Sequence, residues 1–175
     1  MSEDNQEQQA ELIQKTQALQ QNKVPQSQLY STIWDLGKAE YLPAKPVIER
    51  YLTHDNDEIR IAALQVIVGR FAARDRKYWE MARDLLTDDD SGNRIDGTSL
   101  LGTFKRNTQD EETLRLLAPL VSNTQENPIV RRSAYAAMCG IIHFVPLELW
   151  KYTSSDFNLE QDADWELVDR YQSDT

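Results

Sequence analysis

Cysteine, glycine and proline are all scarce in this sequence, and each scarcity excludes a class of structure. The single cysteine, Cys139, rules out an intrachain disulfide, and its position in an apolar run predicts a buried and inert thiol. Six glycines and six prolines are too few for an all-β protein, which needs a tight turn about every ten residues. We therefore expect a helical protein.

Catalytic and metal-binding motifs are lacking as well. The two histidines, His54 and His143, lie far apart, and neither has a second histidine or cysteine at zinc-ligand spacing. The acidic run 88–90 does not fit a calcium loop, because Gly92 falls one position early and Ser99 stands where a glutamate is required. No nucleophile elbow or phosphate-binding glycine loop is present. We expect no catalytic residue, cofactor or metal.

Positive charge and long apolar runs are also limited. The chain carries 29 acidic and 19 basic residues, which gives a net charge of −10. Binding to nucleic acid or anionic lipid needs a basic face, so both partners are disfavoured. No apolar run reaches the roughly eighteen residues of a membrane span, and the N-terminus lacks a secretory signal. We expect a cytoplasmic protein whose partner is another protein, with a basic surface if the acidic residues make the contact.

An arginine that opens a helical segment occurs three times. These residues are Arg60, Arg94 and Arg131, and they are 34 and 37 positions apart. Each follows a turn that contains Asp or Asn, whose side chains can cap the helix. A period of this length fits two antiparallel helices and two turns, so the sequence predicts a series of helical hairpins.

The N-terminal residues differ in composition from the rest of the chain. Glutamine and glutamate dominate residues 1–23, which we interpret as a tail. It can form a marginal helix but buries too little to be stable by itself. From Ser27 the pattern is helical as far as Gly37, a predicted C-terminal cap. We expect a single domain over residues 24–175.

The C-terminal part of that domain follows three predicted hairpins. A cap is expected from about residue 145, with a short segment over 147–152 and a last helix over about 164–171. Trp165 and Val168 of this helix would cover the open end of the hairpin series, which repeat proteins need for solubility.

Residues 28–142 carry a pattern of a proline-bearing first helix, an acidic turn and a second helix that opens with an aliphatic residue and Arg. The stretches 36–39, 46–52 and 59–64 carry it most clearly, with the turn at Asp55. This pattern resembles the HEAT-repeat superfamily of armadillo-like α-solenoids. The resemblance implies an all-α fold, a right-handed α-α superhelix of about three to four HEAT-like hairpins with a C-terminal capping helix.

The same resemblance implies a structural role for the turn residues. Asp55, Arg60, Arg94 and Arg131 would form a polar ladder that fixes the register between hairpins. The middle hairpin departs from the superfamily pattern, since Asn93 replaces the aliphatic residue and Gly97 replaces alanine. We expect its second helix to be tilted, shortened or specialised.

The ending 157–165 is similar to small bacterial HEAT-like proteins, some of them thought to be adaptor or immunity-type proteins. The main functional hypothesis is a non-catalytic protein-binding module: an adaptor, scaffold or immunity-type inhibitor. Two groups of residues are predicted to contact the partner. The helical period places the first group on the outward face of second helices, and the second group lies outside the repeats. The first group is Gln65, Arg94, Asp96, Ser99 and Arg132, and the second group is Trp150 and Tyr152.

Two alternatives follow from other HEAT-like proteins. A bilin lyase-like or chromophore-handling protein would need Arg or His beside aromatic residues, and His143 with Trp150 is the nearest approach. A DNA glycosylase-like protein would need a basic concave face, which this acidic chain does not provide.

Overall fold

The computed structural model describes residues 3–143, 151–152, 154 and 156–172, and these residues form helices and turns with no β-strand among them. The predicted all-α class is therefore confirmed. Over the same residues, every helix is too short or too polar to cross a bilayer. The chain forms two compact units, Met1–Ala73 and Arg74–Thr175. The boundary predicted at residue 24 lies inside the first unit, and the single domain over 24–175 stays a prediction.

The first unit is built from helices that alternate with short 3-10 and π segments. In chain order they are α1 (Glu3–Gln20), α2 (Gln26–Lys38), η1 (Leu42–Ala44), α3 (Lys45–Glu49), η2 (Arg50–Thr53), α4 (Asp57–Gln65) and the π-helical η3 (Val66–Arg70). α2 packs against α4 and η3, and α3 packs against α4. Their apolar faces form one core, which includes Leu29, Ile33, Leu36, Ile48, Ala62, Ala63 and Ile67.

The helix α1 is held by the rest of the first unit. Leu19 is fully buried, and its carbonyl accepts a hydrogen bond of 3.1 Å from the Tyr51 hydroxyl. Lys15 Nζ lies 2.8 Å from Asp35 Oδ2 on α2. These contacts with α2 and η2 supply the stability that a glutamine-rich helix lacks by itself.

Gly37 does not cap α2, contrary to the prediction. The cap is formed by Glu40, whose φ of 49° is left-handed, with Tyr41 N–H donating to Leu36 O at 3.1 Å. Gly37 lies inside the helix and is buried, and a Cβ added there would lie only 2.7 Å from the Val66 side chain. This glycine is needed because α2 and η3 approach closely.

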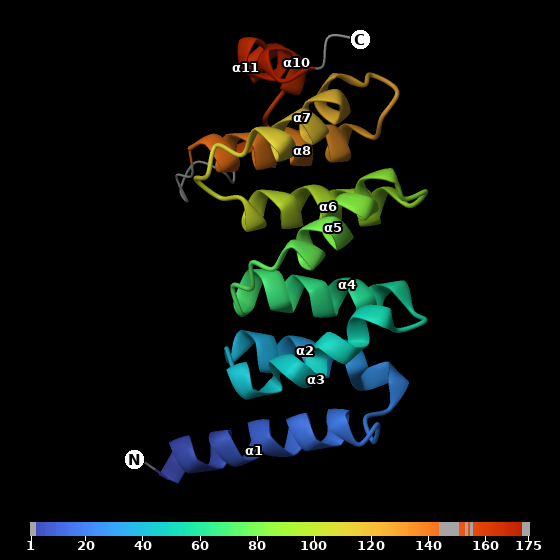
Figure 1. Ribbon diagram of the computed structural model, residues 1–175, viewed down its shortest axis with the longest axis vertical. Helices are drawn as coiled ribbons and strands as arrows, with labels where there is room; N and C mark the ends of the chain where they lie inside the picture. Colours follow the sequence, from blue (N-terminus) through green and yellow to red (C-terminus); the bar gives the residue numbers. More distant parts are fainter. Residues whose placement is uncertain (1–2, 144–150, 153, 155, 173–175) are drawn as a thin grey trace. The chain divides into compact units, whose positions relative to one another are not determined.

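The second unit contains two helical hairpins and a C-terminal pair of short helices (Figure 1). Its elements are α5 (Arg76–Asp84), η4 (Leu85–Thr87), α6 (Ser91–Phe104), α7 (Glu111–Ser122), α8 (Pro128–Ile142), α10 (Leu159–Asp162) and α11 (Trp165–Arg170). α5 pairs with α6, α7 pairs with α8, and α6 lies along α8. α11 packs on α7 through the fully buried Val168, while Trp165 is half-buried.

The helix α6 is not shortened, although its sequence departs from the repeat pattern. It spans 14 residues, and Gly97 and Gly102 lie within it. A Cβ at Gly97 would lie 2.9 Å from Ala82 O, and one at Gly102 would lie 2.9 Å from the Ala137 Cβ. The glycines therefore let α6 approach both α5 and α8, and the expectation of a shorter helix is wrong.

Candidate functional site

Two of the three arginines of the sequence repeat, Arg60 and Arg94, brace the turns before their helices. Asn56, Asp90 and Asn127 cap α4, α6 and α8, and an arginine follows each cap by four positions. Arg60 Nη1 donates to the carbonyls of His54 at 2.6 Å and Asp55 at 3.0 Å. Arg94 Nη1 donates in the same way to the carbonyls of Asp88 at 2.7 Å and Asp89 at 2.9 Å.

The structure assigns different partners to the residues of the predicted ladder. Asp55 contributes its carbonyl, while its side chain is exposed and Arg60 pairs with Asp57. Arg94 pairs with Glu126 in the turn before α8, through contacts of 3.0 and 2.7 Å. This ion pair connects the two hairpins, and hydrogen bonding by Arg94 is the main cause that lowers the pKa of Glu126.

Arg131 behaves differently from the other two repeat arginines. It is buried, donates through Nε to Val121 O at 2.8 Å, and pairs with Glu160 of α10 at 2.6 Å. Its Nη2 atom is buried without a hydrogen-bond partner. Arg131 therefore connects α8 to the C-terminal helices instead of bracing the turn before its own helix.

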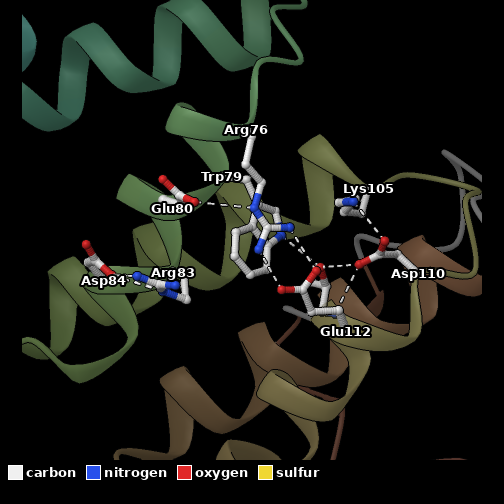
Figure 2. A network of polar contacts seen from close by, with 9 residues as sticks. Arg76, Trp79, Glu80, Arg83, Asp84, Lys105, Asp110 and Glu112 are labelled. Carbon is white, nitrogen blue, oxygen red and sulfur yellow. Dashed lines mark hydrogen bonds and ion pairs between the residues drawn. The ribbon is translucent and has the colours of Figure 1, made fainter.

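A second polar network links the first helices of the two hairpins (Figure 2). The Arg76 guanidinium lies over the Trp79 ring, 3.7 Å from its centroid, and makes two contacts of 2.8 and 2.6 Å with Glu112. Trp79 Nε1 donates to Thr113 Oγ1 at 2.9 Å. Figure 2 also shows Lys105 directed at Asp110, with Nζ 2.7 Å from Oδ1. These opposite charges are paired, so we interpret the network as structural.

Asp110 joins that network to the start of α7. Burial by itself would raise the pKa of Asp110, but hydrogen bonds from Lys105, the Thr113 hydroxyl and the Thr113 N–H together hold it below its ordinary value. The Thr113 contacts are 2.7 and 3.0 Å long, and the N–H contact is the N-cap of α7. One carboxylate thus caps a helix and pairs with a cation.

The strongest candidate site is a cavity of about 420 Å³ near the C-terminus, which we call the C-terminal cavity. Its lining comes from α8, from the segment before α10, from the end of α10 and from the N-cap of α11. The lining residues are Tyr135, Lys151, Tyr152, Ser154, Asp156, Phe157, Asp162 and Asp164. All of them belong to the second unit.

Three aromatic rings form one wall of the C-terminal cavity. Tyr152 meets Tyr135 edge to face, with centroids 5.3 Å apart, and meets Phe157 in the same way at 5.4 Å. Tyr135 and Phe157 are stacked at 5.7 Å. Such edge-to-face and stacked contacts stabilise the rings in fixed orientations. The wall is therefore preorganised.

Local hydrogen bonds hold the segment that carries Tyr152 and Phe157. Arg132 Nη1 on α8 donates to Ser154 O at 3.0 Å, and Phe157 N–H donates to the same carbonyl at 3.3 Å. The Tyr135 hydroxyl accepts the Asp164 N–H at 2.8 Å. These bonds attach the segment and the start of α11 to α8.

The rim of the C-terminal cavity is acidic. The residues that line the cavity include three carboxylates, Asp156, Asp162 and Asp164, and the ammonium group of Lys151. Asp162 Oδ2 accepts the Asn158 N–H at 2.8 Å, and Asp164 Oδ1 accepts the Leu167 N–H at 3.1 Å. A carboxylate has about four acceptor positions, so these caps leave acceptor capacity for a ligand.

Cys139 lies beside the aromatic wall and is not an activated thiol. Burial is the main cause that raises the pKa of Cys139, and hydrogen bonds with Tyr135 and Tyr152 offset it only in part. Burial also raises the pKa of the Tyr135 and Tyr152 hydroxyls. All three groups are therefore protonated near neutral pH, which suits binding better than nucleophilic chemistry.

The predicted partner-binding residues belong to both units and differ in their surroundings. On α6, Arg94 is occupied by Glu126, Asp96 is half-buried and Ser99 is exposed. Gln65 is half-buried on α4, in the other unit, and Arg132 supports the C-terminal cavity through Ser154. The binding role of these residues stays a prediction.

Of the aromatic candidates, Tyr152 lines the C-terminal cavity and Trp150 lies outside the described residues. His143 is exposed at the end of α8. Sequence reasoning did not identify the other cavity residues as a site. A usable signal was the presence of two aromatic and four acidic residues over 152–164, because that composition suits cation binding.

Within the part of the chain that the structure describes, no group of three or more metal-ligating side chains is gathered. Neither a search of protein-family models nor a search of curated proteins finds a match to this sequence. The geometry of the C-terminal cavity therefore has to carry the functional proposal.

Proposed function

We propose that this chain is a non-catalytic protein-binding module, an adaptor, scaffold or inhibitor, built as a HEAT-like α-solenoid. The observation that carries the proposal is the C-terminal cavity, where a fixed aromatic wall faces three carboxylates and one ammonium group. Aromatic side chains surrounded by polar groups are typical of binding hot spots. The acidic rim and the net charge of −10 favour a partner with a basic surface.

The repeated contacts between the hairpins of the second unit support the solenoid part of the proposal. Arg76–Glu112, Trp79–Thr113 and Arg94–Glu126 join residues that are 36, 34 and 32 positions apart. Thr98 and Ser133, 35 positions apart, add a hydroxyl contact of 2.6 Å. A nearly constant separation is expected when equivalent residues of successive hairpins lie side by side.

The charge of the C-terminal cavity also bears on the chromophore-handling alternative. A bilin carries carboxylates, which Asp156, Asp162 and Asp164 would repel. The same repulsion applies to nucleic acid. A basic protein surface is the ligand class that this cavity attracts.

Site-specific cross-linking from the C-terminal cavity tests the proposal. A photoreactive phenylalanine replaces Tyr152 in one protein and Tyr30, an exposed tyrosine of the first unit, in another. Both are irradiated in the native lysate, and captured proteins are identified by mass spectrometry. The expected result is one protein captured from position 152 alone.

The purified partner is then titrated calorimetrically. We expect Tyr152→Ala to weaken its binding about tenfold, since hot-spot truncations cost more than about 1 kcal/mol, and Tyr30→Ala to leave it unchanged. High salt should also weaken the complex. Equal affinity of the Tyr152→Ala variant and the wild type would overturn the proposal for this site.

A further inference from the structure

We infer that the C-terminal cavity binds the ammonium group of a lysine side chain from the partner, and that Lys151 of this chain competes for the same position. The inference rests on the proposed function for the source of that lysine. The cavity itself, the aromatic wall and the position of Lys151 are properties of this chain.

The position of Lys151 identifies where a cation is stabilised. Lys151 Nζ lies 4.9 Å from the centroid of the Tyr152 ring. An ammonium group within about 6 Å of a ring face is attracted by the electron density of the ring. The ring cannot turn away, because Tyr135 and Phe157 pack against it. The face of the Tyr152 ring is therefore a fixed position for a cation, and Lys151 occupies it in this structure.

The carboxylates show that the cavity can hold more positive charge than Lys151 provides. The lining contains Asp156, Asp162, Asp164 and one ammonium group, that of Lys151, and so carries a formal charge of −2. A second ammonium group would still leave an acidic lining. The cavity volume of about 420 Å³ gives room for a lysine side chain, whose methylene groups can cover the aromatic wall.

The choice of ammonium over guanidinium follows from the same geometry. Arginine prefers to make two parallel N–H···O bonds to both oxygens of one carboxylate, as Arg76 does with Glu112 elsewhere in this unit. At the rim, one oxygen of Asp162 and one oxygen of Asp164 already accept backbone N–H groups. A compact ammonium group needs no paired oxygens and suits this arrangement better.

If Lys151 competes for the cavity, the Lys151→Gln variant should bind a lysine probe more tightly than the wild type. Replacing Lys151 by glutamine removes the competing cation and makes the cavity more acidic. The affinity for a lysine probe should therefore rise about threefold to tenfold. Lys38→Gln changes the net charge equally but alters an exposed lysine in the first unit, so it should leave the affinity unchanged.

The experiment titrates the full chain with Nα-acetyl-lysine N-methylamide and follows the backbone amide signals by NMR. Parallel titrations use the norleucine derivative, which has the chain without the charge, and the arginine derivative. We expect the lysine probe to shift signals of the cavity residues, with tighter binding to Lys151→Gln and weaker binding to Tyr152→Ala. Asp156→Asn, which keeps the side-chain shape, serves as a second loss-of-binding variant.

Three outcomes would overturn the inference: equal binding of the norleucine probe, stronger binding of the arginine probe, or no gain in the Lys151→Gln variant. These outcomes are distinguishable from a failure of the proposed function. If the lysine probe does not bind but the captured partner still depends on Tyr152, only the inference is wrong. If the probe binds but the partner has the same affinity for the Tyr152→Ala variant as for the wild type, the proposed function is wrong at this site.

Discussion

The hairpin interface of the second unit and the C-terminal cavity both carry many charges, but they arrange them in opposite ways. At the interface, Arg94 meets Glu126 and Lys105 meets Asp110, each pair at 2.7 Å. The lining of the cavity holds three carboxylates and one ammonium group. Matched charges fix which residues face each other, whereas an excess of one sign next to a cavity favours a charged ligand. The local balance of charge therefore differs between the two regions of this protein.

The close approach of α5 and α6 within one hairpin should be the feature of the second unit that is most sensitive to substitution. Gly97→Ala would place a Cβ 2.9 Å from both Ala82 O and Leu85 Cβ. We expect a loss of about 1–3 kcal/mol in the free energy of unfolding, measured by urea denaturation. Gly69→Ala is the matched control, because its Cβ would meet nothing within 4 Å, and it should be neutral or slightly stabilising. Equal effects would show that helix contact is not the reason for Gly97.

The Arg94–Glu126 ion pair should have the next largest effect. Its side chains are only 17% and 9% exposed, so Glu126→Gln leaves a poorly solvated arginine and should cost about 1–2 kcal/mol. Glu111→Gln disrupts a pair whose side chains are 57% and 62% exposed, and it should cost no more than about 0.5 kcal/mol. Thermal unfolding monitored by circular dichroism measures both. A smaller loss for Glu126→Gln than for Glu111→Gln would contradict the structural role of the buried pair.

Lowering the pH should weaken the Arg94–Glu126 ion pair. The pKa of Glu126 lies below its ordinary value of 4.5 in the folded protein, chiefly because Arg94 donates hydrogen bonds to it. The unfolded chain therefore takes up the proton first, and the stabilisation is present above about pH 4.5 and is lost as the pH falls further. The stability difference between wild type and Glu126→Gln should shrink over this range. A constant difference down to pH 3 in urea titrations would exclude this linkage.

The smallest stability effect is expected in the C-terminal cavity. Asp156→Asn removes one of several like charges at an exposed position, so the free energy of unfolding should change by no more than about 0.5 kcal/mol. Calorimetry with a basic partner should show weaker binding for the same variant. If Asp156→Asn instead destabilises the protein as much as Glu126→Gln, the rim is structural and the contrast with the interface is wrong.

Sequence patterns predicted the parts of the fold that depend on neighbouring residues. A capping Asp or Asn was expected in the turn before each repeat arginine, and Asn56, Asp90 and Asn127 cap α4, α6 and α8 there. The all-α class follows from the same signals. Helix ends were less predictable, since Glu40 adopts the left-handed cap conformation that glycine usually provides.

Features that depend on distant contacts could not be predicted. α1 is ordered by burial of Leu19 and by bonds to α2 and η2, which its own composition does not encode. Glu126 is one of 29 acidic residues, and nothing in its local sequence selects it as the partner of Arg94. The cavity needs turns around Ser154 that bring Tyr135 and Phe157 together. Helical periodicity contains no information on such turns.

The short C-terminal helices have a consequence for the kinetics of recognition. α10 and α11 span four and six residues, which is too few for a stable isolated helix. Their order therefore depends on contacts with the rest of the unit, such as the hydrogen bond from Asp164 N–H to the Tyr135 hydroxyl. Such segments open locally at a lower free energy than the whole domain. A partner that fills the cavity adds contacts only in the closed form. A ligand bound in the cavity should therefore slow this opening, and amide hydrogen exchange at Asp164 reports the opening directly.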